Sequence, residues 1–180
     1  MVMVLLAEGF EECEALAPVD ILRRGGVAVA TVGIGGKTIS GSHGISVVCD
    51  LVAEDACFDE MEALILPGGM PGTRNLEKSS AVQSFLDFAD KHSLLIGAIC
   101  AAPSILGHKG LLQGKRATCY PGFEQDLLGA EVTGEPVVRD EMIITAYGAG
   151  AAFEFGLALL SALKTPDIAD EIQTGIKIKK

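Results

Sequence analysis

The chain has 180 residues, of which 49% are hydrophobic and 21% charged, and its formal net charge is −10. This length and composition fit a single folded domain, 1–180, with a sizeable core, and they exclude a disordered chain. The acidic balance argues against nucleic-acid binding, because the only basic cluster is Lys177, Lys179 and Lys180 near the end of the chain.

The cysteine pattern indicates reduced thiols and a cytoplasmic protein. Five cysteines are an odd number, and no two have the Cys-x-x-Cys spacing, which argues against both a disulfide framework and a zinc site. The three histidines have no metal-ligand spacing either, so no metal is expected. The apolar start, Met1–Ala7, is short and lacks a basic flank, so we expect a buried strand there and not a signal peptide. No apolar run is long enough to cross a membrane.

Short apolar runs alternate with amphipathic stretches along the chain. In chain order we expect a strand at Val2–Leu6, a helix at Glu12–Arg24, a strand at Val27–Val32, a small hairpin around Gly35–Gly41, strands at Ile45–Val48 and Ala63–Leu66, a helix at Ser80–Lys91, a strand at Leu94–Ile99, a helix at Ser104–His108, a strand at Met142–Thr145, and helices at Ala151–Leu163 and Asp167–Gln173. Strands that are hydrophobic throughout indicate an α/β fold with a mostly parallel sheet and helices on both faces.

Ligands of such sheets bind beyond the carboxyl ends of the strands. Three loops are expected to meet there, at residues 7–14, 67–72 and 100–103.

Cys100 is the strongest candidate for a reactive residue. It follows the strand Leu94–Ile99 and precedes a short helix, and the residues two before and two after it are Ala98 and Ala102. This pattern is typical of a nucleophile elbow, with Cys in place of Ser and Ala in place of the flanking Gly. The helix N-terminus is expected to favour the thiolate. The same residues are also compatible with a buried, inert cysteine.

The first loop is acidic, and one of its carboxyl groups is within reach of the elbow. Glu11 and Glu12 are expected to complement the helix dipole, whereas Glu14 lies one turn inside the helix. Two anions in contact repel, so beside Cys100 a desolvated Glu14 would stay protonated and could exchange protons during catalysis. The alternative for Glu14 is a surface capping role.

The turn Pro67-Gly68-Gly69 ends a strand and can direct backbone N–H groups into the crevice. With the N–H of Ala101 it could form an oxyanion hole, although the same residues also suit a plain turn. Gly148 and Gly150 do not form a dinucleotide fingerprint, because a third glycine and a following acidic residue are missing. No cofactor is therefore expected.

Several segments together resemble the ThiJ/PfpI superfamily, and within it the branch of the Parkinsonism-associated deglycase and its bacterial relatives. The matching segments are AEGFEECEALAPVD (7–20), RRGG (23–26), LILPGGMPG (64–72), NL (75–76), AICAAP (98–103) and GAGAAFEFG (148–156). They occur in the family's order over nearly the whole chain.

The resemblance implies a flavodoxin-like three-layer sandwich, similar to class I glutamine amidotransferases, that forms a homodimer. It implies that Cys100 is the nucleophile, that Glu14 is its protonated partner, and that Gly69 and Ala101 supply backbone amides. It further implies a glutathione-independent glyoxalase or deglycase that acts on methylglyoxal-type dicarbonyls or on glycated proteins and nucleotides. The alternative is a redox-sensing, chaperone-like protective protein that acts through oxidation of Cys100.

The remaining pocket residues also follow from the resemblance, and some depart from the family pattern. Asp20 and Arg24 are implied to lie near the pocket and the dimer interface, and His43 stands where the family often has Arg. Ala101 replaces the His that follows the nucleophile in the protease-like branch, so peptidase activity is not expected. Tyr120 occupies the stretch ATCYPG (117–122), where the human deglycase has a His facing the cysteine, and Tyr is a poor base near neutral pH.

Overall fold

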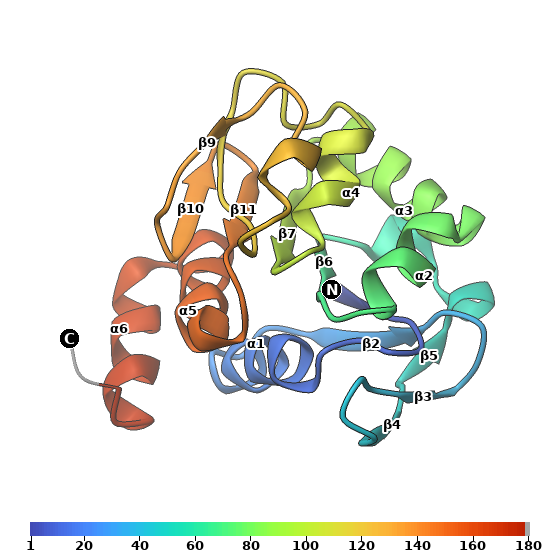
Figure 1. The fold of residues 1–180 in the computed structure, drawn as a ribbon. Coiled ribbons are helices and arrows are strands. Elements are labelled where there is room, and N and C mark those ends of the chain that lie inside the picture. Colours follow the sequence, from blue (N-terminus) through green and yellow to red (C-terminus); the bar gives the residue numbers. More distant parts are fainter. Residues whose placement is uncertain (179–180) are drawn as a thin grey trace.

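A seven-stranded sheet lies between two layers of helices in the computed structural model, which describes residues 1–178 (Figure 1). One face of the sheet is covered by α1 (Glu12–Arg24) and α5 (Ala152–Leu163), and α6 (Pro166–Gly175) packs against α5. The other face is covered by α2 (Gly72–Lys78), α3 (Ser80–Lys91) and α4 (Pro103–His108). This is the expected α/β architecture.

The sheet order is β10-β11-β7-β6-β1-β2-β5. Its strands are β1 (Val2–Leu6), β2 (Val29–Gly33), β5 (Leu51–Val52), β6 (Ala63–Leu66), β7 (Leu95–Ile99), β10 (Val137–Asp140) and β11 (Ile143–Ala146). All neighbouring strands are parallel except the edge pair β10 and β11. Two small separate sheets pair β3 (Thr38–Ser40) with β4 (Ser46–Val48) and β8 (Arg116–Ala117) with β9 (Glu131–Val132).

The interior strand β1 shows why the strands of this sheet are apolar throughout. Along β1, Val2, Val4 and Leu6 pack into the core under α1 and α5, whereas Met3 and Leu5 pack into the core under α2 and α3. All five side chains have 0% exposed surface. A strand buried on both faces needs no polar alternation.

Most expected elements match the structure to within two residues, but one helix and several short strands are new. Helix α2 was not predicted, because Leu76 is the only large apolar residue among its seven residues and one such residue gives no apolar periodicity in the sequence. The edge strand β10 buries only Val138, which leaves a similarly weak apolar pattern.

The topology places the predicted loops together. The carboxyl ends of the parallel strands β1, β6 and β7 lie side by side, and they lead into residues 7–11, 67–71 and 100–102. In the described part of the chain, no helix has the length and apolar character needed to cross a membrane.

Candidate active site

Cys100 lies on a sharp turn between β7 and α4. Its φ is +65°, a left-handed conformation that is uncommon for residues other than glycine and that often occurs at functional sites. The backbone N–H of Cys100 donates to the carbonyl of Ala146 at 2.8 Å, which fixes the turn to the end of β11. Ala98 and Ala102 are both fully buried, as the tight turn requires. The side chain of Cys100 is half-buried.

Glu14 meets Cys100 from the first turn of α1. Its side chain is 1% exposed and forms a hydrogen bond with the thiol. The N–H of Gly68 donates to Glu14 Oε2 at 3.0 Å, and the N–H of Ala149 also donates to this carboxyl. Glu14 is therefore held by groups from three connections, after β6, β7 and β11.

The two glycines after β6 allow this close approach. A Cβ on Gly68 would lie 2.6 Å from both Cys100 Cβ and Glu14 Oε2, so no side chain fits there. Gly69 has a φ of +89°, which suits glycine, and its N–H and that of Ala101 donate hydrogen bonds to the Cys100 sulfur. Both backbone amides named in the sequence prediction thus point to the thiol.

Burial dominates the electrostatics of the pair. Burial, and after it the nearby charge of Glu11, raise the pKa of Glu14, whereas hydrogen bonds from Cys100 and two amides lower it. The net result is an increase from 4.5 to about 7. Burial and the Glu14 carboxylate also raise the pKa of the Cys100 thiol, to about 12, and the amides of Gly69 and Ala101 only partly offset this. The expectation that the helix N-terminus would by itself favour the thiolate is wrong.

Above about pH 7 the two groups therefore share one proton, because burial and their mutual repulsion disfavour two adjacent charges. The proton can lie on sulfur, with Glu14 as carboxylate, or on Glu14, with Cys100 as thiolate. Each anionic form has two backbone amide donors. The arrangement can thus generate a nucleophilic thiolate and an adjacent acid in one proton transfer.

Tyr120 borders the site through its backbone, and its side chain does not bond to the pair. Its backbone N–H donates to the carbonyl of Cys100 at 2.8 Å, and its ring lies beside Gly148. The side chain is 50% exposed, and within residues 1–178 its hydroxyl has no hydrogen bond to Cys100 or Glu14. Its placement matches the predicted position next to the elbow.

His43 is tied to Glu12 and not to the thiol. Its Nδ1 lies 2.9 Å from Glu12 Oε2, and its backbone N–H donates to Glu12 Oε1 at 2.8 Å. Burial alone would raise the pKa of Glu12. The hydrogen bonds from His43, together with those from the backbone amides of Glu12 and Ile45, outweigh burial and lower this pKa to about 2. Glu12 lies in the first turn of α1, where it was expected to complement the helix dipole, but it is also 4% exposed and anchors the loop between β3 and β4.

Glu11, Glu12 and His43 offer ligand atoms that lie within 4.8 Å of one another, a grouping that could hold a metal ion. The hydrogen bonds from the β3–β4 loop to Glu12, and from the Glu14 amide to Glu11, account for the arrangement without one.

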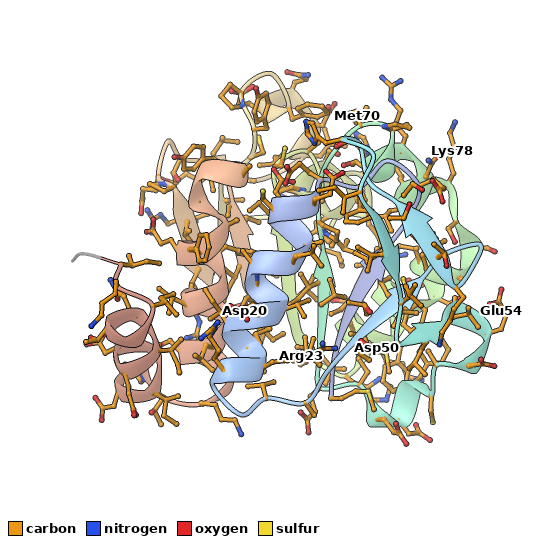
Figure 2. All side chains as sticks on the ribbon, turned by 90° about the horizontal axis from the view of Figure 1, so that it is seen from below. Asp20, Arg23, Asp50, Glu54, Met70 and Lys78 are labelled. Carbon is orange, nitrogen blue, oxygen red and sulfur yellow. The ribbon has the colours of Figure 1, made fainter. Side chains whose placement is uncertain are left out.

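Asp20 and Arg24 lie farther along α1. They form an exposed ion pair with each other at 2.7 Å, and neither has a hydrogen bond to Cys100 or Glu14 in the described chain (Figure 2 labels Asp20). The sequence analysis did not predict the amide of Ala149, because only three loops were expected at the site and the connection after β11 was not among them.

Fold and site together define a class of doubly wound α/β proteins that carry a cysteine elbow paired with a buried carboxyl. The DJ-1/PfpI family description matches residues 1–162, and the chain belongs to this family, in its DJ-1 branch. The chain is similar to protein dj-1beta of Drosophila melanogaster, with 33% identity over 98% of this chain and 96% of that protein.

Two further relatives bear on function. The glutathione-independent glyoxalase DJR-1.2 of Caenorhabditis elegans is 31% identical over 92% of this chain and 89% of that protein. The structure of oxidized DJ-1 from Toxoplasma gondii has a TM-score of 0.94 and 31% identity, and covers 99% of this chain and 98% of that chain.

Glu14→Gln should change how stability depends on pH. The unfolded carboxyl ionises near pH 4.5, whereas folded Glu14 keeps its proton to about pH 7, so this group destabilises the native state as pH rises between these values. Relative to the wild type, the free energy of unfolding of Glu14→Gln should increase by up to about 3 kcal/mol from pH 4.5 to 8. Urea unfolding at several pH values measures this difference, and a difference independent of pH would contradict the assignment.

Proposed function

We propose that the protein is a cysteine-dependent, glutathione-independent glyoxalase or deglycase that acts on methylglyoxal-type dicarbonyls or their adducts. The observation that carries the proposal is the hydrogen-bonded pair of Cys100 and Glu14, with the amides of Gly69 and Ala101 directed at the sulfur. Family membership supports it, because one relative is named as a glutathione-independent glyoxalase. The five free cysteines are consistent with a reducing compartment, and we infer a cytoplasmic location.

The proposed reaction begins with proton transfer from sulfur to Glu14. The Cys100 thiolate adds to the aldehyde carbon of methylglyoxal, and the resulting alkoxide takes a proton from Glu14 to give a hemithioacetal. The amides of Gly69 and Ala101 lie close enough to the sulfur to stabilise the developing oxyanion.

Glu14 then acts as a base. The Glu14 carboxylate removes the proton from the former aldehyde carbon, which leaves an enediolate. Glu14 returns this proton to the neighbouring carbon, and the hydroxyl proton of the former aldehyde carbon passes to the neighbouring oxygen, which gives a lactoyl thioester on Cys100. Water hydrolyses the thioester, which releases lactate and regenerates the thiol, so that the net change is addition of one water to methylglyoxal. A pKa of Glu14 near 7 suits a group that must both donate and accept a proton at neutral pH.

Substitution of either member of the pair should abolish turnover. Cys100→Ser and Glu14→Gln should each lower the rate of lactate formation from methylglyoxal by at least about 100-fold, because nucleophile or proton shuttle is lost. Cys57→Ser, which removes an exposed thiol outside the site, is the matched control and should keep full activity.

A parallel assay on a purified methylglyoxal–thiol adduct, with free methylglyoxal monitored, separates deglycation from consumption of the released aldehyde. Wild-type rates in either Cys100→Ser or Glu14→Gln would overturn the mechanism.

A second candidate function is redox sensing through Cys100, in a protective, chaperone-like protein. The relative from Toxoplasma gondii is described as oxidized, and the same amides that would stabilise an oxyanion would also stabilise an oxidised sulfur. The nearby charge of Glu11, together with partial burial, raises the pKa of the exposed Cys13 thiol, which disfavours its thiolate. The pKa of the Cys100 thiol is raised as well, to about 12, so thiol pKa does not favour Cys100 over Cys13. What distinguishes Cys100 is the pair of backbone amides directed at its sulfur and the adjacent Glu14 carboxyl, which can accept the thiol proton.

Limited hydrogen peroxide should add two oxygen atoms to Cys100 before other cysteines react. Peptide mass spectrometry follows the sulfinate at each position over time. Glu14→Gln should change the rate at Cys100 more than at Cys13, because Glu14 exchanges a proton with Cys100 and acts on Cys13 only through its charge. Equal rates of oxidation at Cys100, Cys13 and Cys57 would remove the basis for the sensing function.

We further propose that the protein forms a homodimer through α1. An apolar hollow on this face is lined by side chains from the β3–β4 loop, α1 and the start of α5, namely Glu12, Cys13, Leu16, Ala17, Asp20, Ile45 and Phe153. Figure 2 shows α1 and α5 side by side on this face. Ile45 is 56% and Phe153 50% exposed, and a two-fold contact between copies would bury both.

Phe153→Glu should convert the dimer to a monomer, because it introduces two facing charges into a two-fold interface. Light scattering coupled to size-exclusion chromatography measures the mass. Leu128→Glu, at an exposed apolar residue between η3 (Glu124–Asp126) and β9, is the matched control and should leave the dimer intact. A monomeric wild type, or a dimeric Phe153→Glu variant, would refute the proposed interface.

A further inference from the structure

Glu11 lies where the loop after β1 meets the loop after β6, and it bonds to both halves of the site. Its backbone N–H donates to the carbonyl of Gly68 at 3.0 Å. Its side-chain Oε2 accepts the backbone N–H of Glu14 at 2.7 Å, which caps the first turn of α1. The side chain is only 16% exposed. A single residue thus links the Glu14 backbone to the glycine turn.

The contact between the two loops is too close to adjust independently. A Cβ on Gly69 would lie 2.4 Å from the backbone nitrogen of Glu11 and 2.7 Å from the carbonyl carbon of Phe10. The amide of Gly69, which donates to the Cys100 sulfur, is therefore positioned against the backbone of residues 10 and 11. A shift of Glu11 would move this donor as well as Glu14.

The Glu11 carboxylate also acts on Glu14 through its charge. Two titratable groups face Glu14: the Cys100 thiol from the elbow, and the Glu11 carboxylate from the start of α1. The connections after β6 and β11 present only the uncharged amides of Gly68 and Ala149. The nearest basic group is His43, but its Nδ1 lies 3.9 Å from Glu11 Oε1 and 2.9 Å from Glu12. His43 is therefore engaged with Glu12, and the negative charge of Glu11 continues to disfavour ionisation of Glu14.

We propose that Glu11 is a positioning residue of the thiol–carboxyl pair: its backbone holds the glycine turn, its side chain fixes the Glu14 amide, and its charge keeps a proton on Glu14. Glu11 has no direct hydrogen bond with Cys100, so it acts through Glu14 and Gly68. The inference rests on the proposed function only for its link to turnover, since the proton affinity of Glu14 can be measured without substrate.

Glu11→Gln separates charge from geometry, because the amide oxygen can still cap α1 and the backbone N–H is unchanged. In protein labelled with ¹³C at glutamate Cδ, the Glu14 signal is assigned by its loss in Glu14→Gln and titrated by NMR. The midpoint in Glu11→Gln should fall by roughly 0.5 to 1 pH unit. In methylglyoxal assays the kcat/KM profile should shift in the same direction, with KM little changed.

Glu8→Gln is the matched control, because it removes an equal charge from the same loop, where Glu8 bonds to the amide of Ser40. It should leave the Glu14 midpoint in place. An unchanged midpoint in Glu11→Gln, or an equal shift in Glu8→Gln, would overturn the proposal. Absence of methylglyoxal turnover in the wild type would instead count against the proposed function and leave the titration result standing.

Discussion

A single proton shared between a buried carboxyl and a buried thiol is the interaction on which this structure depends. Glu14 and Cys100 are 86 residues apart in the chain. Burial disfavours the charged form of each side chain. Backbone amides from three connections compensate, since Gly68 and Ala149 donate to the carboxyl while Gly69 and Ala101 donate to the sulfur. The parallel sheet makes this possible, because it brings the carboxyl ends of its strands to one edge.

The groups that stabilise this pair are mainly backbone amides and not side chains. Gly68 leaves no room for a Cβ between the thiol and the carboxyl, and Gly69 turns its amide toward sulfur through a positive φ. The Glu12 side chain supports the site from outside, because it is buried and holds the β3–β4 loop. Tyr120 borders the elbow through its backbone N–H and not through its side chain. Within residues 1–178 the side-chain hydrogen-bond partner of Cys100 is Glu14, so this carboxyl is the group that can exchange a proton with the thiol.

The sequence predicted those parts of the molecule that carry strong periodic or positional signals. The bounds of β1, α1, β6 and α3 agree with expectation, because each combines a continuous or amphipathic apolar pattern with clear ends. The convergence of Glu14, Gly69 and Cys100 followed from the topology of parallel strands. Helix α2 could not be predicted from its few buried residues, and the raised pKa of Cys100 depends on burial and on a neighbour that only the folded chain supplies.

The elbow also has a consequence for the evolution of stability in this chain. Cys100 occupies a backbone conformation in which glycine is unstrained and cysteine is not, so the native state carries a local cost at its reactive residue. A population selected for thermal resistance alone would accept glycine there and lose the sulfur. If cysteine is retained at position 100 under such selection, its retention would show that the thiol contributes to function, without an assay of the reaction.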